Sequence, residues 1–262
     1  MEEAACLGLA SGPNWGDSSV MSASSIVVLV TGDPVPETRT RYGGFADLIR
    51  RAAPAFGTSP WLVYDVRELD VLPDLTAAMA VIVTGSPFSV TEALPWMDRT
   101  AVWLRQLVTA NVPLLGICFG HQLLGQALGG QVRLNPSGRE MGTVPYTTSQ
   151  DDPVFGRRGT TVVNSTHVDS LVQLPVGARA VGSTERDPHA AVRFGASAWG
   201  VQFHPEIDAG VMRQYLEARR ALLLAEGFDV DAAERELRDA PDGAAVIERF
   251  LRLARAQRGL AA

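Results

Sequence analysis

Short apolar runs that alternate with helical patterns fill the first half of the chain and limit the folds open to it. Candidate buried strands, rich in Val, Ile and Leu, lie at residues 26–30, 61–66, 80–83 and 114–117. Helical patterns lie at residues 45–53, around Leu69, Leu72 and Leu75, at 95–110 and at 122–128. Strands that alternate with helices pair in parallel, because each helix carries the chain back across the sheet. The pattern predicts an α/β fold with a doubly wound, mostly parallel central sheet and helices on both faces.

Shorter β-rich segments replace this alternation in the second half of the chain. They are expected at residues 142–148, 160–164, 178–182, 191–194 and 198–203. Three helical patterns follow, with acidic residues where helices begin, at Asp208, at Asp229 or Asp231, and at Asp242. These segments predict a small additional β-rich portion that extends the main sheet or lies beside it.

Domain organisation follows from the same pattern. Residues 1–25 are rich in Ser, Gly and Ala and show no sustained period, so we expect a flexible leader there. Residues 26–262 are expected to form one domain, because α/β folds of this length often share one continuous core.

Composition excludes several classes of partner. Apolar residues make up 46% of the chain and charged residues 20%, a balance typical of a globular enzyme. The formal net charge of −6 argues against a nucleic acid and against an anionic membrane surface, because both bind clustered Lys and Arg. The start Met1-Glu2-Glu3 lacks the cationic beginning of a secretory signal, and no apolar run reaches the roughly 18 residues that span a bilayer. We therefore expect a cytoplasmic protein.

Cys118 stands between a predicted buried strand and a predicted helix, in Gly116-Ile117-Cys118-Phe119-Gly120. This Gly-x-nucleophile-x-Gly form forces a reactive side chain onto a tight turn above the end of the sheet. The start of the following helix favours an anion, so it lowers the pKa of a thiol placed there. The other cysteine, Cys6, lies in the predicted leader, so no structural disulfide is expected. Taken without its context, Cys118 is equally well a small buried apolar residue.

That context comes from Gly200-Val201-Gln202-Phe203-His204-Pro205-Glu206, an apolar strand that ends in a histidine and a glutamate separated by one proline. His204 would exchange a proton with Cys118, while Glu206 would hold the imidazole and stabilise its positive form. By itself, a histidine at a strand end beside a solvated carboxylate is the simpler interpretation. Together with the cysteine turn, the pattern predicts a hydrolase site of Cys118, His204 and Glu206.

Acyl transfer also needs donors for the oxyanion of the tetrahedral intermediate. The backbone amide of Phe119, directly after the nucleophile, is the first predicted donor. The amide of Ser86, in the small-residue turn Thr84-Gly85-Ser86-Pro87, is the second. A simple turn from strand to loop is the alternative interpretation of this second segment.

Three motifs, in this order, resemble the class I glutamine amidotransferase family over about residues 26–215. They are Gly85-Ser86-Pro87, Gly116-Ile117-Cys118-Phe119-Gly120-His121-Gln122 and His204-Pro205-Glu206. The branch that looks nearest is the stand-alone, GMP-synthase-like amidotransferases. The resemblance implies a flavodoxin-like fold, a γ-glutamyl thioester on the cysteine with release of ammonia from glutamine, and the histidine and glutamate as the rest of a triad.

The resemblance also implies which residues bind the substrate. They are Gly85, Gln122, and the loop at residues 164–169 with His167, Val168 and Asp169. Related enzymes such as GMP synthase have glycine where Val168 stands, so a reshaped contact is expected there. His121 is expected to support the turn. No metal site is expected, because the four histidines lack the spacing of metal ligands.

Three alternatives for the physiological role stay open. The chain has no Gly-rich phosphate loop, so we expect no cofactor and, for an amidotransferase, a synthase partner chain that accepts the ammonia. Without an acceptor, the protein is expected to be a γ-glutamyl peptide or amide hydrolase that acts on a metabolite. The third alternative is a non-catalytic binding or regulatory protein with the same fold.

Overall fold

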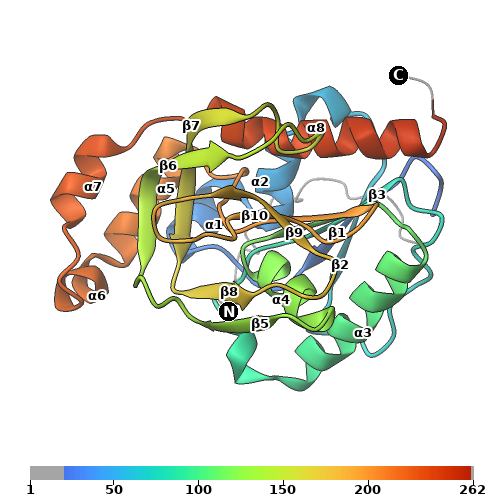
Figure 1. Cartoon of the computed structure of the whole chain (residues 1–262), viewed down its shortest axis with the longest axis horizontal. Coiled ribbons are helices and arrows are strands. Elements are labelled where there is room, and N and C mark those ends of the chain that lie inside the picture. The colour runs from blue at the N-terminus through green and yellow to red at the C-terminus, as the bar shows by residue number, and fades with distance from the viewer. Residues whose placement is uncertain (1–20, 261–262) are drawn as a thin grey trace, which may run out of the picture.

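The computed structural model describes residues 21–260, and a nine-stranded sheet runs through it in the order β2-β1-β3-β4-β11-β10-β9-β6-β7 (Figure 1). The parallel strands are β1 (Ile26–Val30), β2 (Trp61–Asp65), β3 (Ala80–Val83), β4 (Leu114–Ile117) and β11 (Ala198–Val201). Antiparallel pairing continues from β11 through β10 (Ala191–Arg193), β9 (Arg179–Ser183), β6 (Glu140–Thr148) and β7 (Gly159–His167). A separate two-stranded sheet consists of β5 (Gln131–Leu134) and β8 (Asp169–Gln173). The predicted fold class, α/β with an added β-rich portion, is confirmed.

Helices lie on both faces of the sheet and at one end of it (Figure 1). They are α1 (Pro36–Tyr42), α2 (Phe45–Arg51), α3 (Pro95–Thr109), α4 (Phe119–Ala127), α5 (Ala209–Ala218), α6 (Arg220–Ala225), α7 (Val230–Glu236) and α8 (Pro241–Gln257), with short 3-10 turns η1 (Pro54–Phe56) and η2 (Val90–Glu92). None of the helices in this described part has the length and apolar content needed to cross a bilayer.

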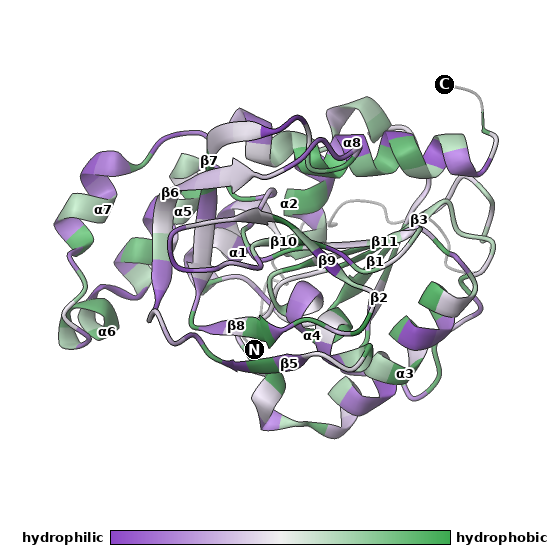
Figure 2. Ribbon diagram, viewed as in Figure 1, coloured by the Kyte–Doolittle hydropathy of each residue, from purple (hydrophilic) through white to green (hydrophobic). Residues whose placement is uncertain are grey.

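The parallel strands are buried on both faces, because successive side chains point alternately into two apolar layers. Ile26 and Val28 of β1 pack in the layer that contains α2 and α8. Val27 and Leu29 pack in the layer that contains α3 and α4. Figure 2 shows green and purple residues mixed along α3 and α8, as in helices that turn one apolar face to a sheet.

A third apolar cluster fixes the helices that follow β11. Phe45 of α2, Met141 of β6, and Met212 and Tyr215 of α5 pack together with Leu223 of α6. The predicted starts of two of these helices are confirmed, because Asp208 and Asp229 cap α5 and α7 and each accepts a backbone N–H at 2.8 Å. This cluster holds the end of α5 close to the carboxyl ends of the parallel strands.

The helix predicted around Leu69, Leu72 and Leu75 is wrong. The chain between β2 and β3 has no helix, and of these three leucines only Leu75 is buried. Pro73 lacks an amide hydrogen and disfavours the helical conformation at the residue before it. Asp74 then accepts the amide of Thr76 at 2.9 Å in a local turn. The segment is therefore a loop, and among these leucines only the buried side chain of Leu75 anchors it.

Residues 1–20 of the predicted leader lie outside the described residues. The rest of it, residues 21–25, leads directly into β1. Ser25 is fully buried, and its carbonyl oxygen accepts the amide of Met79 at 2.8 Å beside the start of β3.

Gly116 offers a test of how tightly β4 and α4 pack. A Cβ at this position would lie 2.6 Å from the carbonyl of Gly120 and 2.7 Å from the amide of His121, both backbone atoms that cannot swing away. We expect Gly116→Ala to lower the free energy of unfolding by about 1–3 kcal/mol or more. Urea denaturation measures this effect. Gly195→Ala is the matched control, because nothing lies within 4 Å of its added Cβ, and equal midpoints for the two variants would contradict the packing described here.

Candidate active site

The turn between β4 and α4 holds Cys118 in an unusual backbone conformation. Its φ of 50° and ψ of −103° lie outside the regions that a residue with a side chain normally adopts. The amide of Cys118 donates to the carbonyl of Val201 at 2.7 Å, and the amide of Gly120 donates to that of Thr84 at 3.1 Å. The turn is thus fastened to β11 on one side and to β3 on the other, which places the sulfur at the carboxyl end of the sheet.

Cys118, His204 and Glu206 come together at this end of the sheet. Nδ1 of His204 lies 2.8 Å from Oε1 of Glu206, and both residues are 3% exposed. A Cβ on Gly85 would lie 2.8 Å from Cε1 of His204 and 3.7 Å from Cβ of Cys118. Gly85 therefore borders the imidazole and the cysteine, and the missing side chain leaves the ring its space.

Electrostatics favour the charged forms of the cysteine and the histidine. Burial by itself raises the pKa of the Cys118 thiol, but the charge of His204 and a hydrogen bond to it bring the pKa below its ordinary value. Burial by itself lowers the pKa of His204, but the neighbouring Glu206 and Cys118 raise it to about 10. The two shifts share the attraction between a thiolate and an imidazolium, and Glu206 adds to the shift of His204. Both shifts favour the thiolate, the form in which a cysteine acts as a nucleophile.

Two side-chain amides connect the sulfur to the substrate-binding segment. Nε2 of Gln202 lies 3.5 Å from Sγ of Cys118, and Oε1 of Gln202 accepts from Nε2 of Gln122 at 3.0 Å. The same Nε2 of Gln122 donates to the carbonyl of Asp169 at 2.8 Å. Gln202 was not among the predicted site residues. Its polarity within the apolar run Val201-Gln202-Phe203 is the signal that points to it, since it is fully buried.

The segment predicted as a loop at residues 164–169 has a different structure. Residues 164–167 end β7, Val168 is a single connecting residue, and Asp169 begins β8. The prediction missed this because β7 pairs with β6 along its whole length, up to the pair of Glu140 and His167. Both ring nitrogens of His167 are engaged inside the protein, at 2.9 Å from the carbonyl of Asp169 and 3.3 Å from Oε2 of Glu140.

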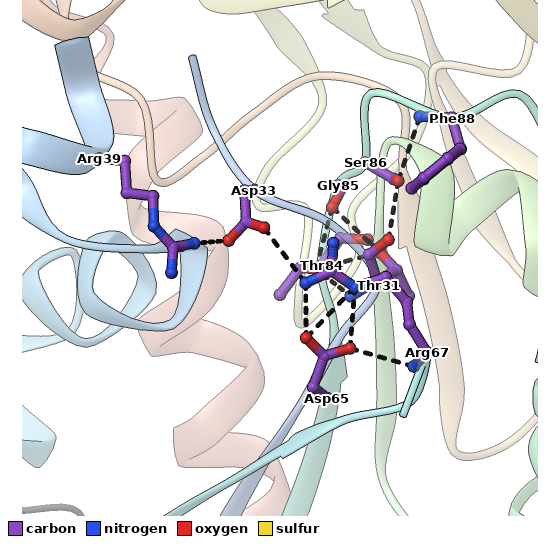
Figure 3. A network of polar contacts seen from close by, with 9 residues as sticks. All are labelled: Thr31, Asp33, Arg39, Asp65, Arg67, Thr84, Gly85, Ser86 and Phe88. Atoms are coloured by element: carbon purple, nitrogen blue, oxygen red, sulfur yellow. Dashed lines mark hydrogen bonds and ion pairs between the residues drawn. The ribbon is translucent and has the colours of Figure 1, made fainter. Parts of the chain in front are cut away.

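The oxyanion candidates lie at the ends of β3 and β4. Phe119 is the first residue of α4, and Ser86 follows β3 (Figure 3). The hydroxyl of Ser86 donates to the carbonyl of Thr31 at 2.8 Å and accepts the amide of Phe88 at 3.2 Å. The hydroxyl therefore fixes the turn against the residue that follows β1, and the role of the backbone amide of Ser86 as an oxyanion donor stays a prediction.

Most of the predicted residues line one cavity of about 460 Å³. They are Ser86, Cys118, Phe119, Gln122, His167, Val168 and Asp169. His204 instead lines an adjoining cavity of about 330 Å³. Arg219, which was not predicted, lines both cavities. No group of three or more possible metal ligands occurs within residues 21–260.

His121 lies behind the nucleophile. It is fully buried against Phe194 and has no hydrogen-bond partner among the described residues, and burial first of all lowers its pKa to about 3. It is therefore a neutral packing residue, as is fitting for a residue that supports the turn.

The thiolate and imidazolium pairing predicts a distinct pH profile of alkylation. Iodoacetamide should modify Cys118 with an inflection below the value of about 8.5 for a free thiol, because His204 lowers the pKa. In His204→Gln, burial and the charge of Glu206 raise the pKa and only the smaller effect of His167 lowers it, so the inflection should move above that value. Peptide mass spectrometry follows Cys118 separately from Cys6. Identical profiles in the two proteins would show that the histidine does not control the thiol.

Known proteins resemble this chain over the region that carries the site. The family model for class I glutamine amidotransferases matches residues 42–222. A glutamine amidotransferase-like protein of Schizosaccharomyces pombe is 28% identical over 209 residues, which cover 74% of this chain and 84% of that protein. A glutamine-hydrolysing GMP synthase subunit of Saccharolobus solfataricus is 34% identical over 150 residues, 53% of this chain and 77% of that protein.

A similar fold occurs in the crystal structure of a glutamine amidotransferase from Thermotoga maritima. Its TM-score is 0.69 at 22% identity, and the superposition covers 88% of this chain and 98% of that one. At this identity the likeness concerns the fold. The family match spans well over half of the sequence, and the chain therefore belongs to the class I glutamine amidotransferase family.

Proposed function

We propose that the protein hydrolyses the γ-amide of glutamine, or of a closely related γ-glutamyl compound, through a thioester on Cys118. The observation that carries the proposal is the buried pair of Cys118 and His204: Cys118 lines a cavity together with Gln122 and Asp169, and His204 lines the adjoining cavity. A thiolate beside an imidazolium is the arrangement that nucleophilic acyl transfer requires. Family membership gives glutamine as the leading substrate.

The proposed reaction has two halves. In the first, the Cys118 thiolate forms a C–S bond to the γ-carbonyl, and the amides of Phe119 and Ser86 stabilise the oxyanion. His204 gives its proton to the leaving nitrogen, the C–N bond breaks, and ammonia or an amine departs. In the second, His204 takes a proton from water, the hydroxide attacks the thioester, and the thiolate leaves. Glu206 holds the imidazole and balances its charge throughout.

The acceptor of the ammonia is the next part of the proposal. The relative from Saccharolobus solfataricus is named as one subunit of a GMP synthase, and we propose that ammonia passes to a synthase partner of this type. Every step uses only groups of this chain, substrate and water, so the proposal includes no cofactor. We also propose that the protein acts in the cytoplasm.

A second candidate function is hydrolysis of γ-glutamyl peptides or amides without any acceptor. One observation favours it, namely the cavity of about 330 Å³ that His204 lines and that adjoins the cavity of Cys118. The share of liquid volume of one water molecule is about 30 Å³, so this cavity has far more room than ammonia needs. Comparing turnover of free glutamine with that of γ-glutamyl dipeptides and γ-glutamyl amines separates the two functions.

Cys118→Ser tests the nucleophile. We expect glutaminase and γ-glutamyl hydrolase activity to fall by at least about 10³-fold, because a serine beside His204 is a far weaker nucleophile than the thiolate. Ammonia and glutamate release are measured by coupled assay. Cys6→Ser is the matched control and should behave as the wild type. Retained activity in purified Cys118→Ser protein would end the proposal, as would absence of turnover and of any acyl-enzyme with every γ-glutamyl compound tried.

Glu206→Gln tests the partner of the imidazole. The substitution keeps the shape but removes the negative charge that stabilises the protonated His204, so kcat should fall by about 10²- to 10⁴-fold, less than in the nucleophile variant. KM should change little, because Glu206 lines neither the cavity of Cys118 nor that of His204. Steady-state kinetics on glutamine gives both constants. A loss confined to KM would instead assign Glu206 to substrate binding.

A further inference from the structure

Arg219 lies at the end of α5, beside the candidate nucleophile. Its Nη1 donates to the hydroxyl of Thr166 at 3.1 Å, and its guanidinium lies 5.3 Å from the centre of the Tyr215 ring. The carbonyl oxygen of Thr166 is in turn 3.9 Å from Sγ of Cys118. Thr166 thus contacts both the guanidinium and the region of the reacting sulfur, and Arg219 lines both cavities.

This guanidinium has no carboxylate partner within residues 21–260, although it is partly buried. By contrast, the partly buried Arg67, Arg139 and Arg220 all form ion pairs. A guanidinium has five N–H donors, so most of those on Arg219 remain for a ligand. Partial burial of a charge without a counterion costs free energy that an anionic ligand would offset.

The acidic residue that lines the cavity of His204 already forms ion pairs with other arginines. Asp33 is the one acid among the residues that line this cavity. Figure 3 shows its carboxylate held between Arg39 and Arg67, with Nη2 of Arg67 at 3.2 Å. Arg67 is bound in addition to Asp65. The loop after β1 therefore neutralises its own charge and provides no counterion for Arg219.

Proton transfer decides which part of a substrate occupies which cavity. Cys118 and Gln122 line the larger cavity, His204 lines the other with Phe45 and Tyr215, and Arg219 lines both. Since the imidazole must reach the leaving nitrogen, the acyl portion belongs beside Cys118 and the leaving group belongs on the side of His204.

We infer that Arg219 binds a carboxylate carried by the leaving amine, so that the preferred substrates are γ-glutamyl amino acids. The products are then glutamate and a free amino acid, with water as the second substrate. This inference rests on the proposed hydrolysis through Cys118 and narrows its substrate class. Arg219 is a specificity-determining residue on this view, because the leaving group of glutamine is ammonia, which has no carboxylate for Arg219 to bind.

A matched pair of substrates isolates this carboxylate: γ-glutamylglycine and γ-glutamylglycinamide differ by one charge and hardly in size. For the wild type we expect kcat/KM to be about 10- to 100-fold higher for the acid, the effect of one charge-assisted hydrogen bond. In Arg219→Gln the ratio should fall to about 1, and in Arg219→Lys it should take an intermediate value. Arg213→Gln, an exposed arginine on α5, is the control and should keep the wild-type ratio. Thermal unfolding checks that each variant is folded.

Two results would overturn the inference. One is a wild-type enzyme that does not distinguish the acid from the amide. The other is an Arg219→Gln variant that loses the same factor on both and on glutamine, which would assign Arg219 to the common glutamyl group or to the thiolate. Calorimetric binding of the same pair to Cys118→Ala protein repeats the comparison independently of turnover. Failure of the hydrolase proposal is distinct, since it would appear as activity that survives substitution of Cys118.

Discussion

The backbone of Cys118 is the constraint on which the rest of the site depends. Its positive φ persists only because hydrogen bonds to Val201 and Thr84 hold the turn from both sides and because Gly116 and Gly120 let strand and helix approach closely. Those partners belong to β11 and β3, the neighbours of β4 in the sheet. The order of the parallel strands therefore determines where the sulfur of Cys118 lies.

Environment separates the roles of histidines that the sequence presents as equals. His204 lies against a carboxylate and a thiolate and becomes more basic, with a pKa of about 10. His121 is buried among apolar groups and becomes so weak a base that it stays neutral, with a pKa of about 3. His167 is buried too, but Glu140 raises its pKa. An acidic partner outweighs burial at His204 and His167, whereas burial without such a partner keeps His121 neutral.

Local sequence pattern predicted the parallel strands and brought out Cys118, His204 and Glu206, because strand periodicity and a nucleophile turn are short-range signals. It failed where the decisive contact lies far away in the chain. The leucines at 69–75 have a helical spacing, but Pro73 disfavours a helix there. The connection between β7 and β8 depends on the pairing of β7 with β6. Gln202 and Arg219 entered the site only through contacts with Cys118 and Thr166, which are distant in sequence.

The carboxyl-terminal helix α8 lies beyond the segment that the family model matches. The family match ends at residue 222, yet Val246, Ile247 and Phe250 of α8 are buried and belong to the same apolar layer as Ile26 and Trp199 of the sheet. Figure 1 shows this helix lying along the sheet. A polypeptide shortened to residues 42–222 would expose the apolar strand surface that α8 covers, and exposed apolar patches favour aggregation. The family match and the apolar core thus end at different residues of this chain.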